Sequence, residues 1–316
     1  MKHVIIVGTG YMALEYAKCL GYLNVPVYVL GRRELYRARF EKQGVRYVCG
    51  TVLSNSELFA AAQIVIVCCS IESNLSVLVD VGLVSSARIY LEKPGFLCSE
   101  SWRDATDLLR QHDLWVVFNR RFFRLSEIFR QGIGDNPGGK LFVDISDDIR
   151  SIESTTKGTL VQQRWVVANS IHVIDLADWL TGGFDLLRAS VKGGLACHPS
   201  GHIFNGEGLS DGSVSVHVMG EFSDRGRWKI AYETDQICFT LKPLEKLEIR
   251  DAVTGQSQVV VESEVDGLKP GLLEACRSML SGHEDKRFCE LNNLGRVISA
   301  CEMVGGYTKA HDNDQV

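Results

Sequence analysis

The chain has 316 residues, 45% of them hydrophobic and 23% charged, and a formal net charge of −5. This length suits two domains with sizeable cores. The acidic balance gives no electrostatic reason to expect nucleic acid or an anionic membrane as a partner. No apolar run approaches the roughly 18 residues of a membrane span. Ten cysteines without C-x-x-C spacing favour buried thiols in a reducing compartment, so a cytoplasmic protein is expected.

The first element is an apolar strand at residues 3–7, which leads directly into the turn GTGYMA at residues 8–13. A helix is expected from residue 11 to residue 20. In such a turn the first glycine permits a tight bend, the second lets the backbone approach a pyrophosphate, and the third position needs only a small residue. The helix amino terminus then favours the phosphate anion. The alternative is a glycine turn that binds nothing. The predicted dinucleotide contacts here are Gly8, Thr9, Gly10, Tyr11 and Met12.

The second strand, residues 25–30, indicates which dinucleotide binds. It ends in Gly31, Arg32 and Arg33, where an NAD-binding unit usually places a carboxylate for the ribose hydroxyls. The first carboxylate is Glu34, already in the next helix. Two guanidinium groups suit a 2′-phosphate, so NADP(H) is preferred over NAD(H). The alternative is a solvated basic helix start.

Further strands and helices alternate up to residue 119. Apolar strands are predicted at residues 45–48, 63–68, 87–91 and 114–118, and helices at residues 54–62, 74–83 and 99–112. This alternation predicts an α/β fold with a doubly wound parallel sheet, a Rossmann domain over residues 1–119.

The tripeptide Glu92-Lys93-Pro94 follows the fifth of these strands. A lysine at the carboxyl end of a parallel strand lies on the edge where such sheets bind ligands, and its ammonium can reach a substrate hydroxyl or carbonyl. On its own, the tripeptide would be an ordinary exit from a strand into a loop. The upstream glycine turn makes an enzyme the better interpretation.

The second part of the chain has a different pattern. A helix at residues 124–131 and a turn-rich segment at residues 132–139 precede strands that have no helices between them. These strands are predicted at residues 140–149, 186–193, 213–222, 227–233, 236–241 and 246–250, and two helices follow at residues 270–281 and 291–309. We expect an α+β domain over residues 120–316 with a mainly antiparallel sheet. Its strands alternate apolar and polar residues, so one sheet face needs a cover, and self-association is expected.

Two other groups of residues were considered as sites. Arg120 and Arg121 suit a substrate carboxylate or phosphate, and equally suit pairing with surface acids. Cys197, His198 and His202 lie close together in the sequence, but they lack a fourth ligand at plausible spacing. We interpret them as a polar loop and predict no metal site.

Four segments together resemble the glucose–fructose oxidoreductase/inositol dehydrogenase/rhizopine catabolism (Gfo/Idh/MocA) family: residues 8–13, the tripeptide at 92–94, residues 119–122, and residues 170–180 with His172 and Asp175. The resemblance extends to about Tyr307. It implies a Rossmann domain followed by an open-faced antiparallel sheet that serves as a homodimer or homotetramer interface. The implied chemistry is NAD(P)-dependent oxidoreduction of sugars, cyclitols or their derivatives.

The residues and the resemblance together define the predicted site. Hydride transfer to or from an alcohol carbon requires a group that exchanges the hydroxyl proton, and Lys93 with His172 is the best pair for this task. Asp175, one helical turn beyond His172, shares its face. The alternative is an amphipathic helix whose aspartates are solvated. Further cofactor contacts are predicted at Cys69, Ser70, Asn74, Glu92 and Lys93. Substrate contacts are predicted at Lys93, Arg120, Arg121, Trp165, Asn169 and His172.

The match to the family is incomplete. Members commonly have an aspartate four residues before the histidine, where this chain has Ala168, and a small glycine where it has Ser170. A proline and a histidine of the family fall at Ser70 and Asn74. Three functions therefore stay open: an NADP(H)-dependent dehydrogenase or reductase of sugar derivatives, a cofactor-bound sensor or regulatory subunit without catalysis, and a reductase of an imine-like biosynthetic intermediate.

Overall fold

The computed structural model describes residues 3–211, 214–263 and 265–307. The chain forms two compact units, the first made of Met1–Arg124 and Ser263–Gly295, the second of Leu125–Glu262 and Arg296–Val316. A single break at residue 119 was expected, so the return of residues 263–295 to the first unit is a difference. Residues 263–295 return because α10 (Leu272–Ser281) packs on α1 (Tyr11–Tyr22) and β16 (Cys289–Glu290) pairs with β6 (Leu114–Val117), and both α1 and β6 lie far earlier in the sequence. No helix in the described ranges combines the length and the apolar character that crossing a membrane requires.

The first unit contains a seven-stranded sheet in the order β16-β6-β5-β4-β1-β2-β3. All strands but β16 are parallel, and β16 pairs antiparallel with β6. Every residue of β1 is buried, as expected for a parallel strand covered on both sides. The doubly wound parallel sheet predicted from the sequence is confirmed. The strands are β1 (His3–Val7), β2 (Val27–Gly31), β3 (Arg46–Cys49), β4 (Ala62–Val67), β5 (Arg88–Glu92), β6 (Leu114–Val117) and β16 (Cys289–Glu290).

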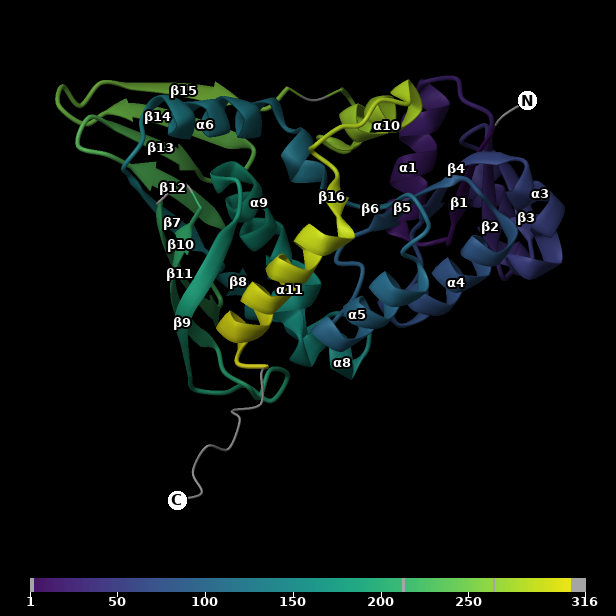
Figure 1. Ribbon diagram of the computed structural model, residues 1–316, viewed down its shortest axis with the longest axis horizontal. Coiled ribbons are helices and arrows are strands. Elements are labelled where there is room, and N and C mark those ends of the chain that lie inside the picture. The colour runs from purple at the N-terminus through teal and green to yellow at the C-terminus, as the bar shows by residue number, and fades with distance from the viewer. Residues whose placement is uncertain (1–2, 212–213, 264, 308–316) are drawn as a thin grey trace, which may run out of the picture. The chain divides into compact units, whose positions relative to one another are not determined.

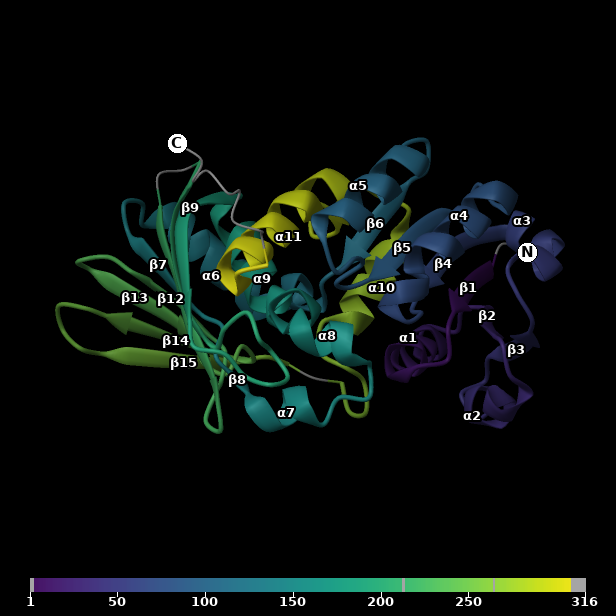
Figure 2. The same ribbon diagram turned by 90° about the horizontal axis from the view of Figure 1, so that it is seen from below.

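Helices cover both faces of this sheet (Figure 2). On one side lie α1 (Tyr11–Tyr22), α2 (Arg37–Glu41) and α10 (Leu272–Ser281), and on the other α3 (Ser56–Ala60), α4 (Asn74–Val84) and α5 (Ser99–Leu108). Because the helix after β1 and the helix after β4 lie on opposite faces, the crossover direction reverses between these neighbouring strands. Open α/β sheets bind ligands beside the carboxyl ends of the strands at such a switch point. Short 3-10 turns complete the unit: η1 (Glu34–Tyr36), η2 (Leu53–Asn55), η3 (Ile71–Ser73) and η4 (Asn119–Phe122).

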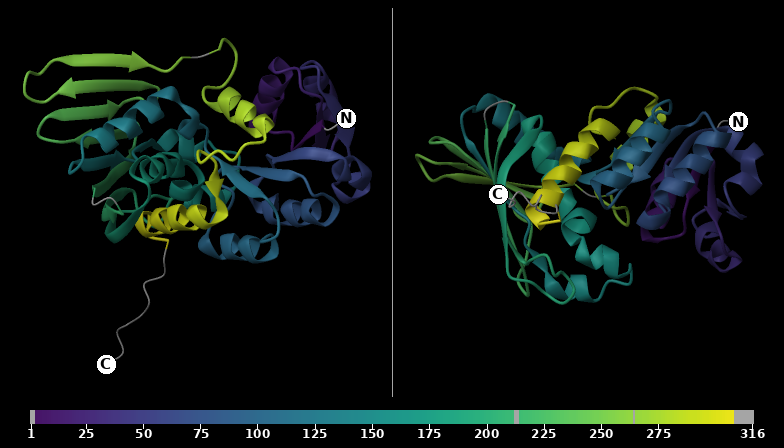
Figure 3. Two further views of the ribbon diagram at one scale, coloured as in Figure 1. Left: turned by 45° about the horizontal axis from the view of Figure 1, so that its top comes forward. Right: turned by 60° about the horizontal axis from the view of Figure 1, so that its bottom comes forward.

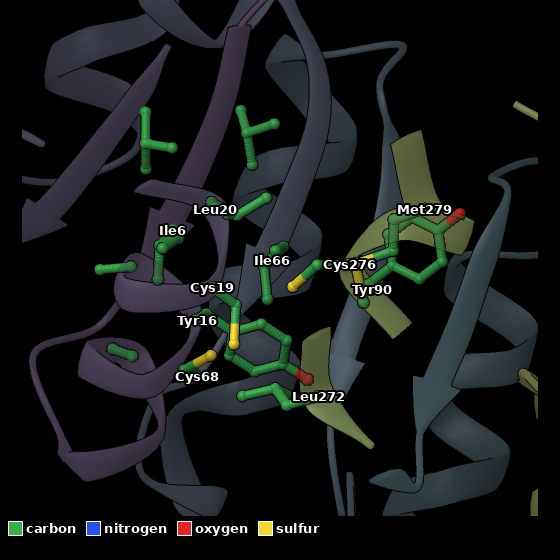
Figure 4. Packing of buried hydrophobic residues seen from close by; sticks show 14 of the residues in the cluster. Ile6, Tyr16, Cys19, Leu20, Ile66, Cys68, Tyr90, Leu272, Cys276 and Met279 are labelled. Atoms are coloured by element: carbon green, nitrogen blue, oxygen red, sulfur yellow. The ribbon is translucent and has the colours of Figure 1, made fainter. Parts of the chain in front are cut away.

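The core between the sheet and helices α1 and α10 explains why residues 263–295 belong to the first unit. Tyr16 and Cys19 on α1 pack with Cys276 on α10 and Cys68 beyond β4, and Figure 4 shows their side chains gathered together. Burial raises the pKa of the Cys68 and Cys276 thiols well above the ordinary value. These thiols are buried, as their apolar sequence context predicts, and a raised thiol pKa makes them poor nucleophiles.

The second unit contains a nine-stranded sheet in the order β15-β14-β13-β12-β7-β11-β10-β9, with β8 also paired to β11. Strand β11 is parallel to β7 and to β8, and the other pairs are antiparallel, so the prediction of a mainly antiparallel sheet is confirmed. The strands are β7 (Lys140–Asp144), β8 (Asp147–Asp148), β9 (Phe184–Lys192), β10 (Ile203–Ser210), β11 (Ser215–Ser223), β12 (Lys229–Glu233), β13 (Ile237–Leu241), β14 (Lys246–Asp251) and β15 (Ser257–Val261).

Helix α9 packs on β7 and β12 of this sheet and on the π-helix before it (Figures 1 and 3). All ten residues from Ile171 to Leu180 are buried. An ion pair between Arg296 Nε and Asp178 Oδ1, 2.8 Å apart, fixes the later part of α11 to α9. The helices are α6 (Arg124–Asp135), α7 (Ile149–Glu153), α8 (Thr159–Gln163), the π-helix η5 (Val166–Ser170), α9 (Ile171–Thr181) and α11 (Leu291–Gly305).

Two predicted elements differ clearly from the structure. The strand expected over residues 140–149 ends at Asp144, because the Asp144 carboxylate accepts the Ser146 N–H, 2.9 Å away, and Asp148 caps α7. Helix α6 continues to Asp135, into the first half of the segment expected to be a turn, where Gly132 lets the helix approach the Phe239 ring on β13. The expected end of the last helix at Lys309 lies outside the described residues.

Strand β10 was not among the strands expected from the sequence. Its two glycines, Gly206 and Gly208, lower the strand propensity of residues 203–210. A Cβ atom on Gly208 would lie 2.4 Å from the Asp185 carbonyl oxygen, at a register shift between β10 and β9. The glycine that hides the strand in the sequence is therefore required by a close backbone approach in the sheet.

Candidate functional site

The glycine turn after β1 has the backbone that a pyrophosphate site needs. Gly8 has φ +123°, and a Cβ atom there would lie 2.5 Å from the Cys68 carbonyl oxygen, so only glycine fits. At Gly10, by contrast, an added Cβ atom would meet nothing within 4 Å. Gly10 is the N-cap of α1 and has no side-chain cap, and the first turn of α1 carries no acidic residue. The open space and the uncapped N–H groups fit a dinucleotide pyrophosphate.

Two further features complete this turn. Ala13, the small third position, is fully buried against the sheet. Tyr11 is 60% exposed, and the Lys269 ammonium lies 5.1 Å from the centre of its ring. The Lys269 charge thus lies beside the exposed Tyr11 ring at the start of α1. Met12 is half-buried against the core.

The end of β2 presents cations and no available carboxylate. Arg32 and Arg33 are exposed. Glu34 accepts two hydrogen bonds from Arg37, at 2.7 and 3.0 Å, and the Arg37 hydrogen bonds lower the pKa of the Glu34 carboxyl. The Tyr47 hydroxyl donates to the Arg33 carbonyl at 2.6 Å and fixes the loop. Two exposed guanidinium groups and a carboxylate already bound to Arg37 thus lie at the end of β2.

The residues after β4 have two different environments. Cys69 is half-buried, and burial raises the pKa of its thiol to about 11, although the Arg32 charge opposes the shift. Ser70 is exposed, and its hydroxyl lies 2.9 Å from that of Ser73. Asn74 is buried, and its amide nitrogen donates to the Gly95 carbonyl at 2.8 Å. Asn74 therefore holds the loop that follows Lys93, while Cys69 and Ser70 border the open edge.

Glu92 and Lys93 are half-buried at the carboxyl end of β5. The Tyr16 hydroxyl donates to Glu92 Oε2 at 2.9 Å, and Tyr16 is fully buried. Burial, and next the Glu92 charge, raise the pKa of Tyr16 well above its ordinary value. Glu92 is thus anchored from α1, and with Asn74 it fixes both sides of the segment that carries Lys93.

Arg120 and Arg121 in η4 are not equivalent. Arg121 is only 3% exposed, and its guanidinium lies 5.6 Å from the centre of the Phe118 ring. Arg120 is half-buried. Asn119 donates to the Pro270 carbonyl at 3.0 Å and ties this turn to the segment before α10. Burial favours a structural role for Arg121. For Arg120, both a substrate contact and pairing with an acidic side chain stay open.

In the second unit, Trp165 and Asn169 converge on one carboxylate. Trp165 Nε1 donates to Asp147 Oδ2 at 2.8 Å, and Asn169 Nδ2 donates to the same oxygen at 2.7 Å. The Asp148 N–H donates to Asp147 Oδ1 at 3.0 Å. Burial raises the pKa of Asp147, and the three hydrogen bonds oppose that rise. Asn169 lies in the π-helix η5, a distortion often found at functional sites.

His172 and Asp175 lie directly after η5, on α9. His172 is 8% exposed and Asp175 is 1% exposed, so the alternative of a helix with solvated aspartates is wrong. The His172 ring lies 5.8 Å from the centre of the Trp228 ring. Ala168, at the position where the resembled family has an aspartate, is buried. Lys93 belongs to the first unit, and His172 and Asp175 belong to the second.

The loop with Cys197, His198 and His202 is structural. His198 is fully buried, its Nδ1 lies 2.5 Å from the Gly201 carbonyl oxygen, and its Nε2 lies 2.5 Å from the Tyr307 hydroxyl. Within residues 3–211, 214–263 and 265–307, no group of three or more His, Cys, Asp or Glu side chains is arranged to hold a metal ion.

Sequence reasoning missed two residues of this region, Asp147 and Trp228. Asp147 lies in a segment that was expected to be one long strand, and its partners are 18 and 22 residues away in sequence. Because Asp148 follows directly and is also acidic, the sequence did not distinguish Asp147 from its neighbour. The pair Asp147 and Asp148, which interrupts an apolar strand 18 residues before Trp165, is the feature that could have indicated it.

No protein-family model and no curated protein matches the sequence. Solved structures, however, match nearly its whole length. UDP-N-acetylglucosamine 3-dehydrogenase GnnA from Acidithiobacillus ferrooxidans is 14% identical, with 97% of this chain and 98% of that chain covered and a TM-score of 0.74. Levoglucosan dehydrogenase, in complex with NADH and levoglucosan, is 13% identical, with 96% of each chain covered and a TM-score of 0.74.

A third structure is an oxidoreductase from Agrobacterium radiobacter in complex with NAD+, L-tartaric acid and magnesium. It is 11% identical, with 95% of this chain and 94% of that chain covered and a TM-score of 0.76. Identities this low establish a common fold. The fold that the family resemblance implied, a Rossmann domain followed by an open-faced sheet, is therefore confirmed.

Proposed function

We propose that the chain belongs to the Gfo/Idh/MocA family and is an NADP(H)-dependent oxidoreductase that acts on a hydroxyl or carbonyl group of a sugar, a cyclitol or a derivative of one. The main support for this proposal is that three predicted site residues follow neighbouring strands at the same edge of one sheet. Gly10 follows β1, Cys69 follows β4 and Lys93 follows β5, and these three strands are neighbours. The switch point lies between β1 and β4, where a dinucleotide is expected to bind. The names of the matching structures, among them dehydrogenases of sugar derivatives, support the same chemistry.

The nicotinamide supplies the hydride acceptor or donor when it is bound. The protein residues then have to hold the substrate oxygen and exchange its proton. Lys93 is proposed for the first task; it lies at the carboxyl end of β5, between the anchored Glu92 and the loop held by Asn74. His172 is proposed for the second, since an imidazole exchanges protons near neutral pH. Asp175, buried one turn further along α9, is proposed to orient His172.

The preference for NADP(H) over NAD(H) rests on the end of β2. Arg32 and Arg33 are exposed there, and the nearest carboxylate, Glu34, is bound to Arg37. Arginine can bind a 2′-phosphate through two parallel hydrogen bonds. Action in the cytoplasm stays a prediction from the cysteine pattern.

A second candidate function is a cofactor-bound sensor without catalysis. One observation favours it, namely that Ala168 stands where a carboxylate is common in the resembled family. A carboxylate lost from that position would remove one group that holds the substrate or the histidine.

The test is a panel of neutral sugars, cyclitols and sugar nucleotides, each mixed with the protein and NADP+, with the absorbance of the reduced nicotinamide followed over time. In parallel, NADPH binding is measured by fluorescence titration. The oxidoreductase proposal predicts turnover with at least one compound of the panel. Stoichiometric NADPH binding without turnover, also in the direction of reduction, would favour the sensor instead.

A further inference from the structure

The carboxylate of Asp147 has no role in the site predicted from the sequence, yet two of the predicted substrate residues, Trp165 and Asn169, converge on it. Asp147 Oδ2 accepts from Trp165 at 2.8 Å and from Asn169 at 2.7 Å, and Oδ1 accepts from the Asp148 N–H at 3.0 Å. A carboxylate has about four acceptor positions. Three are filled within the described residues, and the half-buried Asp147 has one acceptor position left.

The hydrogen bond from Asn169 also determines what its amide offers. One amide N–H is directed to Asp147. The second N–H and the amide carbonyl oxygen, on a half-buried side chain, stay available as one donor and one acceptor. Together, the fourth acceptor position of Asp147 and the remaining donor and acceptor of the Asn169 amide match two neighbouring hydroxyl groups, because each hydroxyl group both donates and accepts a hydrogen bond.

The position of Asp147 relative to the proposed proton-exchanging histidine is fixed by one loop. Between β11 and β12, Gly226 lies so close to Asp147 that an added Cβ atom would be 2.4 Å from the Asp147 backbone. Two residues later, the Trp228 ring packs against His172, with the ring centres 5.8 Å apart. The same loop therefore touches both Asp147 and His172. A second connection between Asp147 and His172 is Asn169, which binds Asp147 and lies three residues before His172 in the chain.

We infer that Asp147 is the carboxylate by which this chain recognises its substrate: together with the Asn169 amide it binds a pair of neighbouring, uncharged hydroxyl groups. This inference rests on the proposed function. It also explains how a chain with Ala168 keeps a carboxylate for its substrate, because the acid is supplied by β8 instead of the segment before α9. A negatively charged carboxylate at this place excludes substrates with a carboxylate or phosphate in the same position.

The test compares Asp147→Asn with Asp148→Asn in the complete protein. Asparagine keeps the size of the side chain and can still accept from Trp165. Asp148 is the matched control because its carboxylate is held by Arg150 at the surface, and asparagine also caps a helix. For Asp147→Asn we expect KM for the best neutral polyol to rise about ten- to a hundredfold, the effect of losing a hydrogen bond to a charged group, with an unchanged NADPH dissociation constant. Asp148→Asn should keep the KM of the parent.

Two readouts separate recognition from a merely structural role. A deoxy analogue that lacks the recognised hydroxyl should have the same KM with the parent and with Asp147→Asn. The affinity of the parent for the polyol should fall as the pH drops through the raised pKa of Asp147, and this step should be absent in Asp147→Asn. The charged residues on the elements that pack against Asp147 are Asp148 with its partner Arg150, and Asp224, Arg225 and Arg227 on the loop with Gly226. All of them are unchanged in the variant.

The outcomes distinguish this inference from the proposed function. If the parent oxidises a polyol and Asp147→Asn does so with an unchanged KM, the role of Asp147 is refuted and the oxidoreductase stands. If no polyol is oxidised, but binding of the polyol to the NADPH-loaded protein quenches tryptophan fluorescence and is weakened in Asp147→Asn, the role of Asp147 stands and the oxidoreductase is refuted. If no polyol binds at all, both are refuted.

Discussion

At the scale of single residues, the two glycines of the first turn have different tasks. Gly8 is required by the fold itself, because its φ is +123° and the Cys68 carbonyl oxygen leaves no room for a side chain. Gly10 is not required by its protein neighbours, since a Cβ atom there meets nothing within 4 Å. The open space at position 10 is consistent with a ligand that approaches the backbone there, which stays a prediction from the sequence pattern.

This difference leads to the first prediction. Gly10→Ala should leave the thermal midpoint close to that of the parent, but weaken NADPH binding at least about tenfold, because the methyl group would take the place of the pyrophosphate and overpacking costs on the order of 1–3 kcal/mol. Fluorescence titration and thermal unfolding measure the two effects. Gly134→Ala on α6 is the control, since an added Cβ atom also meets nothing there. Equal NADPH affinity in both variants would show that Gly10 does not face the cofactor.

The second prediction concerns Arg32. In Arg32→Glu the preference for NADPH over NADH should fall at least about tenfold, because a carboxylate repels the 2′-phosphate and accepts from ribose hydroxyls instead. The ratio of the two dissociation constants is the quantity to measure. Arg103→Glu, an exposed arginine on α5, makes the same change of net charge elsewhere. If the unmodified protein binds NADPH and NADH equally well, the assignment of Arg32 is wrong.

At the scale of elements, α9 and the π-helix before it show what the sequence could establish. The order of Trp165, Asn169 and His172 was enough to locate the segment. Its environment was not: the amphipathic alternative left Asp175 and Asp178 in solvent, whereas Asp178 is bound to Arg296 from α11, 118 residues away. Partners this distant leave no trace in a local pattern. The same limitation hid Asp147, whose role depends on donors from another element.

Tyr307 and His198 hold the start of helix η5, and their contribution to the free energy of unfolding should vary with pH. The Tyr307 hydroxyl accepts from the Val166 N–H at 3.2 Å and contacts His198 Nε2. Burial lowers the pKa of His198, and the charge of His202 adds to this. As the pH falls, the unfolded chain therefore takes up a proton at this imidazole first, near its ordinary pKa of about 6.5. The stabilisation is complete above that pH and is lost as the pH falls toward the folded-state pKa.

The third prediction follows from this sign. Between about pH 7.5 and pH 5.5 the free energy of unfolding of the parent should decrease more than that of His198→Gln, in which no proton can be taken up at this position. Urea unfolding at the two pH values gives the difference. His283→Gln, in an exposed loop, should behave like the parent. An equal decrease in parent and His198→Gln would mean that His198 titrates alike in both states.

At the scale of the whole molecule, the sequence predicted more of the first unit than of the second. Parallel strands buried on both faces are continuous apolar runs, so β1, β2, β4 and β5 could be recognised one by one. In the second unit β10 carries two glycines and β8 has only two residues, and both depend on pairing with β11. The return of residues 263–295 to the first unit was not visible either, because it depends on contacts of α10 and β16 with elements more than 150 residues earlier.

The fourth prediction is self-association through the sheet of the second unit. On β11 the buried Val216 and Val218 alternate with His217 and Met219, and the His217 ring stacks on Phe142 of β7 with 5.3 Å between ring centres. Met219 is 41% exposed and Leu209 on β10 is 47% exposed. An open sheet with such a face is expected to pair with a second copy.

Light scattering at micromolar concentration should therefore give the mass of a dimer or tetramer. Met219→Glu should shift the mass toward the monomer, because a charge would be buried in the interface. Leu83→Glu, at a 72% exposed position on α4, should not. A monomer mass for the unmodified protein would argue against an interface on this face.

The central claim is that Lys93 serves chemistry and not the fold. The most direct measurement is the rate of nicotinamide reduction in a single turnover, for the parent, Lys93→Met and the surface control Lys42→Met, together with the NADPH dissociation constant of each. We expect Lys93→Met to bind NADPH nearly as the parent does and to lose at least about a hundredfold in rate, the usual scale for losing a group that acts on the reacting proton or oxygen. Lys42→Met should keep the parent rate. A rate for Lys93→Met close to that of the parent, on a substrate that the parent oxidises, would contradict the account.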